Sequence, residues 1–164
     1  MSGLTEGAKR QLGRLVAVVR DEIAAHERLD ALLAQQEASV ARPSSDAFRE
    51  ATLAIEAELA RAPHRTQKRE TALKAIGAEL GVAGAALTLT SLAERFGAGG
   101  DALRDERDRL QSIALRTQAR TRKVAALVRV HREVTRELLQ SALGDEDEPR
   151  GDVLSGGTLI DAEV

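Results

Sequence analysis

Histidines and cysteines build many active sites and metal sites, and this sequence offers few of them in a usable spacing. It contains no cysteine and three histidines, His26, His64 and His131, which lie far apart in the chain. None has a second histidine four residues away, the spacing that presents two metal ligands on one helix face. His26 and His131 fall on apolar rows of long helices. We therefore expect tolerated core or boundary histidines rather than a metal-binding or pH-sensing pair.

The acidic pairs and the glycine-rich segment also lack the surroundings that catalysis requires. Asp105 and Glu106 are adjacent and Glu56 and Glu58 alternate, so on a helix the two members of each pair diverge. Residues 97–100, Gly-Ala-Gly-Gly, follow no strand and lack the Lys-Ser/Thr pair of a phosphate-binding loop. We expect solvated acids, a helix break at the glycines, and a protein that is not an enzyme and needs no cofactor.

Basic residues in the last third of the chain raise the possibility of a nucleic-acid site. They are Arg116, Arg120, Arg122, Lys123, Arg129, Arg132 and Arg136. Nucleic-acid-binding helices place such charges on one face, often with stacking aromatic residues, whereas these are scattered around the helix without an aromatic among them. The acidic residues expected to pair with them are Glu50, Glu56, Glu58 and Glu70. We therefore expect cations that flank a helix interface, and we do not expect nucleic acid as a partner.

The composition is typical of long helices that pack against one another. Hydrophobic residues make up 43% of the chain and charged residues 30%, but aromatic residues only 1%, which suits narrow aliphatic interfaces. A formal net charge of −2 does not favour a general polyanion-binding protein. The N-terminus lacks the pattern of a signal peptide, and no stretch approaches the about 20 apolar residues of a membrane span. We expect a cytoplasmic protein.

Seven-residue repeats predict two long helices, over about 6–40 and about 102–143. The first repeat consists of Leu12, Val19, His26, Leu33 and Val40. The second consists of Leu103, Leu110, Thr117, Val124, His131 and Leu138. Because the second row is unbroken, we expect it to lie in a helix interface as far as Leu138.

The middle of the chain predicts a broken helix and a short connecting helix. Ser45 or Asp46 can cap the middle helix, and Pro63 kinks or breaks it. Thr90 is a candidate cap for the short helix and Asp101 for the last one. The predicted fold is therefore all-α: an elongated antiparallel helical bundle or coiled coil of three main helices, with a flexible C-terminal tail.

The C-terminal segment differs in composition from the helical part. Residues 145–149, Asp-Glu-Asp-Glu-Pro, are an acidic linker, and the residues after them contain three glycines and no helical period. We therefore divide the chain into a helical coiled-coil domain, 1–144, and an acidic linker with a flexible tail, 145–164. The tail contains two apolar pairs that are candidate docking points: Val153-Leu154 and Leu159-Ile160.

Four segments follow one another in an order that is shared with a known family. They are 88–96 (Thr-Leu-Thr-Ser-Leu-Ala-Glu-Arg-Phe), 103–110, 124–128 (Val-Ala-Ala-Leu-Val) and the ending 156–162 (Gly-Gly-Thr-Leu-Ile-Asp-Ala). With a long helix before them, they resemble the FlgN-type flagellar export chaperones. The resemblance covers nearly the whole chain.

This resemblance implies a cytoplasmic chaperone that binds and protects hook-associated proteins of the hook–filament junction and brings them to the export machinery. A client helix would lie in a groove between helices. The candidate partner-binding residues are Val134, Leu138 and Leu139 of the last helix and Val153, Leu154, Leu159 and Ile160 of the tail. No small-molecule substrate or metal is expected. The alternatives are a structural coiled-coil protein that associates with itself and, as a weaker one, a basic-helix regulator that binds nucleic acid.

Overall fold

The computed structural model describes residues 5–42 and 45–144, and every regular element in this part of the chain is a helix. The long elements are α1 (Glu6–Ser39), α2 (Asp46–Ala60), α3 (Ala62–Leu80), α4 (Leu89–Phe96) and α5 (Asp101–Gly144), and two short 3-10 helices, η1 (Gly84–Ala86) and η2 (Gly97–Gly100), flank α4. No described helix is both long and apolar enough to cross a membrane. The all-α prediction is confirmed. The predicted tail, 145–164, lies outside the described residues.

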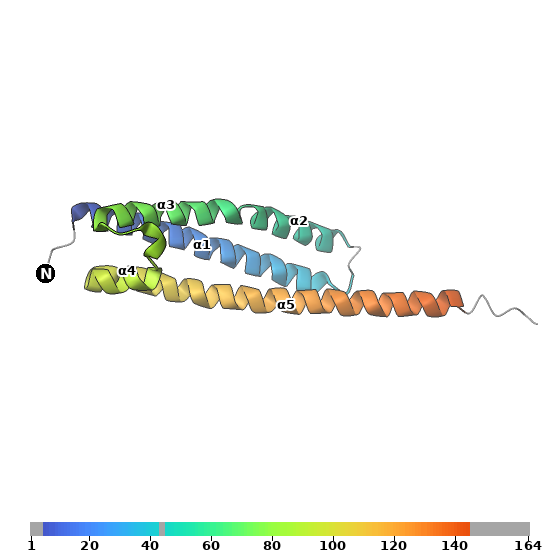
Figure 1. The fold of residues 1–164 in the computed structure, drawn as a ribbon. Coiled ribbons are helices and arrows are strands. Elements are labelled where there is room, and N and C mark those ends of the chain that lie inside the picture. Colours follow the sequence, from blue (N-terminus) through green and yellow to red (C-terminus); the bar gives the residue numbers. More distant parts are fainter. Residues whose placement is uncertain (1–4, 43–44, 145–164) are drawn as a thin grey trace, which may run out of the picture.

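α1 is the central helix of an elongated molecule (Figure 1). α2 and α3 run back along one side of α1 almost end to end, and α5 runs along another side. Since the chain reverses direction twice, α1 and α5 are parallel: Arg20 pairs with Glu106, and further along both helices Glu37 pairs with Lys123. α1, the collinear pair of α2 and α3, and α5 therefore run up, down and up, so that each is antiparallel to the next in the chain, as predicted.

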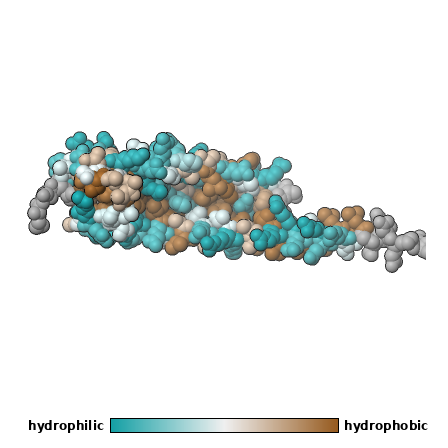
Figure 2. All heavy atoms as spheres, in the orientation of Figure 1, coloured by the Kyte–Doolittle hydropathy of each residue, from teal (hydrophilic) through white to brown (hydrophobic). Residues whose placement is uncertain are grey.

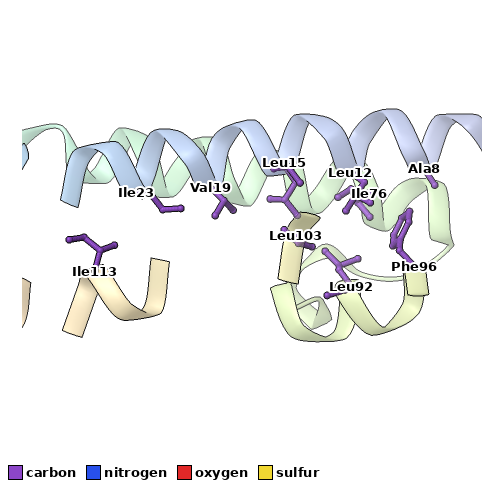
Figure 3. Close-up of a cluster of buried hydrophobic side chains, with 12 residues drawn as sticks. Ala8, Leu12, Leu15, Val19, Ile23, Ile76, Leu92, Phe96, Leu103 and Ile113 are labelled. Atoms are coloured by element: carbon purple, nitrogen blue, oxygen red, sulfur yellow. The ribbon is translucent and has the colours of Figure 1, made fainter. Parts of the chain in front are cut away.

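The hydrophobic core lies along the N-terminal half of α1, where α3, α4 and α5 meet it (Figure 3). α1 contributes Ala8, Leu12, Leu15, Val16, Val19 and Ile23. The other helices contribute Ile76, Leu92, Ala93, Phe96, Leu103 and Ile113. The short helix α4 thus fills the space between α1 and the start of α5, and it does so with the buried ring of Phe96.

Local sequence signals set the ends of the middle helices. Ser45 caps the N-terminus of α2, where its Oγ accepts a hydrogen bond of 3.2 Å from the backbone N–H of Phe48. The break that the sequence predicts near Pro63 falls at Arg61, between α2 and α3. Pro63 lies in the first turn of α3, where a missing N–H removes no helical hydrogen bond. α3 ends at Gly81, whose φ of 67° is the left-handed conformation that glycine adopts without strain.

The caps predicted for the last two helices were wrong. α4 is capped by Thr88 rather than Thr90: Thr88 and Ser91 each accept a hydrogen bond of 3.0 Å from the other's backbone N–H. Asp101 is the first residue of α5, because η2 leads directly into that helix, and its carboxylate pairs with Arg104 instead.

Candidate partner-binding site

The seven-residue row of α5 is buried only along the first part of the helix. Its buried members are Leu103, Thr117 and Val124. His131 is half-buried and Leu138 is 65% exposed. The prediction of an interface as far as Leu138 was wrong, because α1 ends at Ser39 and no other described helix continues beside α5.

The end of α5 therefore extends past the rest of the bundle as a single helix (Figure 1). We call residues 125–144, which follow the last buried residue Val124, the overhang. At about 1.5 Å per residue the overhang is about 30 Å long. Figure 2 shows hydrophobic residues on its surface among hydrophilic ones.

Apolar side chains form a stripe along the overhang. The half-buried members of this apolar stripe are Leu127 and Val128, and the exposed members are Val134, Leu138, Leu139 and Leu143. Spacings of four, seven and eleven residues place them on one broad side of the helix. Single exposed leucines are common on proteins, but a contiguous apolar row marks an interaction surface.

Three of the predicted partner-binding residues belong to this stripe. Val134, Leu138 and Leu139 are 48%, 65% and 56% exposed, so each is accessible to a partner. The surface they make is the face of one helix, and the described residues provide no second wall for the predicted groove. The other four, Val153, Leu154, Leu159 and Ile160, lie outside the described residues.

The basic residues of α5 form two sets rather than one scattered group. Arg116 and Arg120 pair with Asp30 of α1 at 3.2 and 2.9 Å, and Arg120 also pairs with Glu37 at 3.2 Å. A hydrogen bond from Lys123 lowers the pKa of Glu37, and this effect outweighs the burial that raises it. The predicted acidic partners from the middle of the chain were wrong, because α1 rather than α2 or α3 lies beside these cations.

The second set lies away from α1. It consists of Arg122, Arg129, Arg132 and Arg136, none of which forms an ion pair within residues 5–42 and 45–144. Two shallow hollows lie along the overhang, with volumes of about 380 and 550 Å³, and Arg132 and Arg136 line both. Positive charge is thus available beside the apolar stripe.

Glu58 was predicted to be a solvated acid, and it is instead a buried one. Its carboxylate accepts from Arg28 of α1 at 3.3 Å, Arg61 at 3.2 Å and Arg65 at 2.8 Å. Burial raises the pKa of Glu58, but the hydrogen bond from Arg28 and the charges of the three arginines together hold the pKa below its ordinary value. This cluster ties the junction of α2 and α3 to α1. Its role is structural.

The histidines lie on three separate elements. His26 is half-buried on α1, His64 is exposed on α3, and His131 lies on the overhang. Over the described ranges, no group of three side chains could hold a metal ion.

Comparison with known families identifies the chain. The family model described as FlgN protein matches residues 11–150, which include most of α1, all the later helices and therefore the overhang. The chain belongs to the FlgN family. No curated protein and no solved structure matches it. FlgN proteins are flagellar export chaperones, so the resemblance seen in the sequence is confirmed at the level of the family, and flagellar proteins are the expected class of partner. The apolar stripe lies within the part of the chain that the FlgN model matches.

Proposed function

We propose that this FlgN-family protein is a cytoplasmic chaperone that binds hook-associated proteins of the hook–filament junction before their export. It acts by binding, with no catalytic step and no cofactor. The observation that carries the proposal is the apolar stripe on the overhang, whose exposed members from Val134 to Leu143 extend over about 15 Å of helix. An amphipathic helix of the client would lie along this stripe, with its apolar residues at helical spacing against it.

The binding energy would come from burying a few large side chains. Full burial of a valine or leucine side chain stabilises a complex by about 1.5–3 kcal/mol. Association costs translational freedom and the ordering of side chains, so only part of this gain appears as affinity. Val134, Leu138 and Leu139 are about half exposed or more, so a client can still bury much of their surface.

The tail residues are proposed as the second side of the client site. The apolar pairs Val153-Leu154 and Leu159-Ile160 are attached just beyond the overhang. Packed over a bound client helix, they would supply the wall that a single helix lacks. The client would then be held between α5 and the tail.

Calorimetric titration with purified hook–filament junction proteins tests the proposal. We expect Leu138→Asp with Leu139→Asp to weaken client binding at least about tenfold, because a charge buried against an apolar client is costly. The matched control is Leu115→Asp. Leu115 is 59% exposed on the same helix, but it lies before the overhang, in the part of α5 that runs beside α1. Both variants should keep the helical circular dichroism of the wild type.

The main alternative, self-association through the apolar stripe, gives a different result. Light scattering would then show a stable oligomer of the wild type that the Leu138→Asp, Leu139→Asp variant dissociates, with no binding of flagellar clients by either protein. That outcome would replace the chaperone proposal with a structural coiled coil.

A further inference from the structure

We infer that the overhang selects client helices that carry acidic residues along one edge of their apolar face. This inference rests on the proposed function, and it adds the chemistry of the partner. An apolar stripe alone gives affinity but little discrimination, since any amphipathic helix can cover it. The charges beside the stripe supply the discrimination.

Three arginines form one edge of the stripe. Arg129, Arg132 and Arg136 lie at spacings of three, four and seven residues, so they share one side of α5. One hollow places all three beside the apolar side chain of Val128. The other places Arg132 and Arg136 beside Leu139 and Leu143. A helix that covers the stripe therefore has one flank within reach of these guanidinium groups.

The opposite edge of the stripe is not basic. Helical spacing of 100° per residue places Val130 and Glu137, which are seven residues apart, on that side. The overhang is therefore electrostatically asymmetric across the stripe. A client helix with acidic residues on one flank can place them beside the arginines in only one rotation about its own axis. This rotation determines which face of the client helix is buried against the stripe.

Within residues 5–42 and 45–144, the arginines of the edge differ from the earlier cations of α5 in having no carboxylate partner. Asp30 and Glu37 of α1 form ion pairs with cations earlier in α5, namely Arg116, Arg120 and Lys123. By contrast, Arg129, Arg132 and Arg136 have no ion-pair partner in the described part of the chain. Glu133 lines the same hollow as all three but lies within ion-pair distance of none of them.

Guanidinium groups suit this role because they bind carboxylates through two parallel hydrogen bonds and are weakly hydrated. At the rim of an interface, such pairs mainly speed association and reject partners of the wrong charge. Each exposed pair changes affinity only about two- to fivefold. Reversal of two arginines converts two attractions into repulsions, so the combined effect is measurable.

The test is a titration of the full-length protein with a hook–filament junction protein that binds the wild type. We expect Arg132→Glu with Arg136→Glu to weaken binding about tenfold at about 0.15 M salt, mostly through slower association. The matched control is Arg10→Glu with Arg14→Glu: this exposed pair on α1 has the same four-residue spacing, and its reversal changes the net charge equally. The control should bind within about twofold of wild type.

Two further measurements separate a direct contact from a general charge effect. Wild-type affinity should fall as salt rises, and the Arg132→Glu, Arg136→Glu variant should show a weaker dependence. Replacement of the acidic residues of the client's amphipathic helix by lysine should restore binding to this variant and weaken binding to the wild type.

Three results would overturn the inference and leave the proposed function in place. In the first, the two double variants bind the client equally well. In the second, lysine replacements in the client fail to restore binding to the charge-reversed variant. In the third, the Arg132→Glu, Arg136→Glu variant keeps client binding but loses binding of a duplex DNA oligonucleotide at about 0.15 M salt. That result would make the basic edge a nucleic-acid site. Absence of client binding by the wild type would instead overturn the proposed function.

Discussion

Buried carboxylates, and not only apolar side chains, join the helices of this protein. Glu22 of α1 is buried and pairs with Arg69 of α3 at 2.8 Å. Asp30, also on α1, pairs with arginines of α5. A buried ion pair contributes little net stability, because desolvation offsets the attraction, but loss of one partner is costly. These pairs therefore favour one register of the helices over others.

In the sequence, these buried carboxylates are visible only as irregularities in the pattern of apolar and charged residues. Glu22 interrupts the apolar repeat of the first helix, and Glu58 reads as one of several acids on a solvated face. The partner of each depends on which helix lies alongside, at separations of 47 residues for Glu22–Arg69 and 30 for Glu58–Arg28. Local pattern therefore cannot identify these pairs.

Glu58 gives a pH-dependent prediction. Its folded pKa is held below the unfolded value, so its pairing stabilises the protein above the unfolded pKa of about 4.3 and is lost as the pH falls through the folded value. We expect Glu58→Gln to lower the free energy of unfolding by about 1–3 kcal/mol at pH 7. Urea denaturation should show the difference from wild type shrinking as the pH falls below about 4.

The control for this prediction is Glu56→Gln, an exposed neighbour on the same helix. It should leave stability within about 0.5 kcal/mol of wild type at each pH. A Glu58→Gln variant whose deficit is the same at pH 7 and pH 3 would show that the arginine cluster does not depend on the charge of Glu58.

At the scale of elements, most of the fold was predictable, because the signals that begin and end helices are local. The repeats gave both long helices nearly to their ends, and Ser45 and Pro63 marked the middle one. The part of α5 that lacks a partner was not predicted, although the two expected helices differ in length. Its position depends on the parallel register of α1 and α5, which contacts such as Arg20–Glu106 set across the chain.

The division of α5 into a packed part and an overhang predicts unequal effects of similar substitutions. Ile113 is 5% exposed in the core, so Ile113→Ala should lower the free energy of unfolding by about 2–4 kcal/mol. Leu138→Ala should change it by no more than about 0.5 kcal/mol, because Leu138 is 65% exposed. Urea denaturation measures both. Equal losses would mean that the end of α5 is packed in the free protein.

At the scale of the whole molecule, the hydrophobic core and the proposed binding surface lie at opposite ends of the bundle. The core lies along the N-terminal half of α1, whereas the apolar stripe begins where α1 no longer accompanies α5. A client bound as proposed would therefore be held and released without repacking the core. Composition and repeats predicted the helical class, and the family resemblance implied the class of partner. The separation of these two regions appears only once the helices are placed side by side.

The last prediction concerns the proposed tail contacts. Ordering of a chain segment costs about 1–2 kcal/mol per fixed residue, so a few apolar anchors must supply the gain. A chain that ends at Gly144 should keep the fold of the described helices and bind hook-associated proteins more weakly, mostly through faster dissociation. Leu159→Ala with Ile160→Ala should reproduce much of that loss, whereas Ser155→Ala with Thr158→Ala, in the same segment, should not. Stopped-flow or surface-based kinetics would measure the rates. If the shortened chain and the full chain release the client at the same rate, the tail takes no part in holding it, and the overhang alone forms the site.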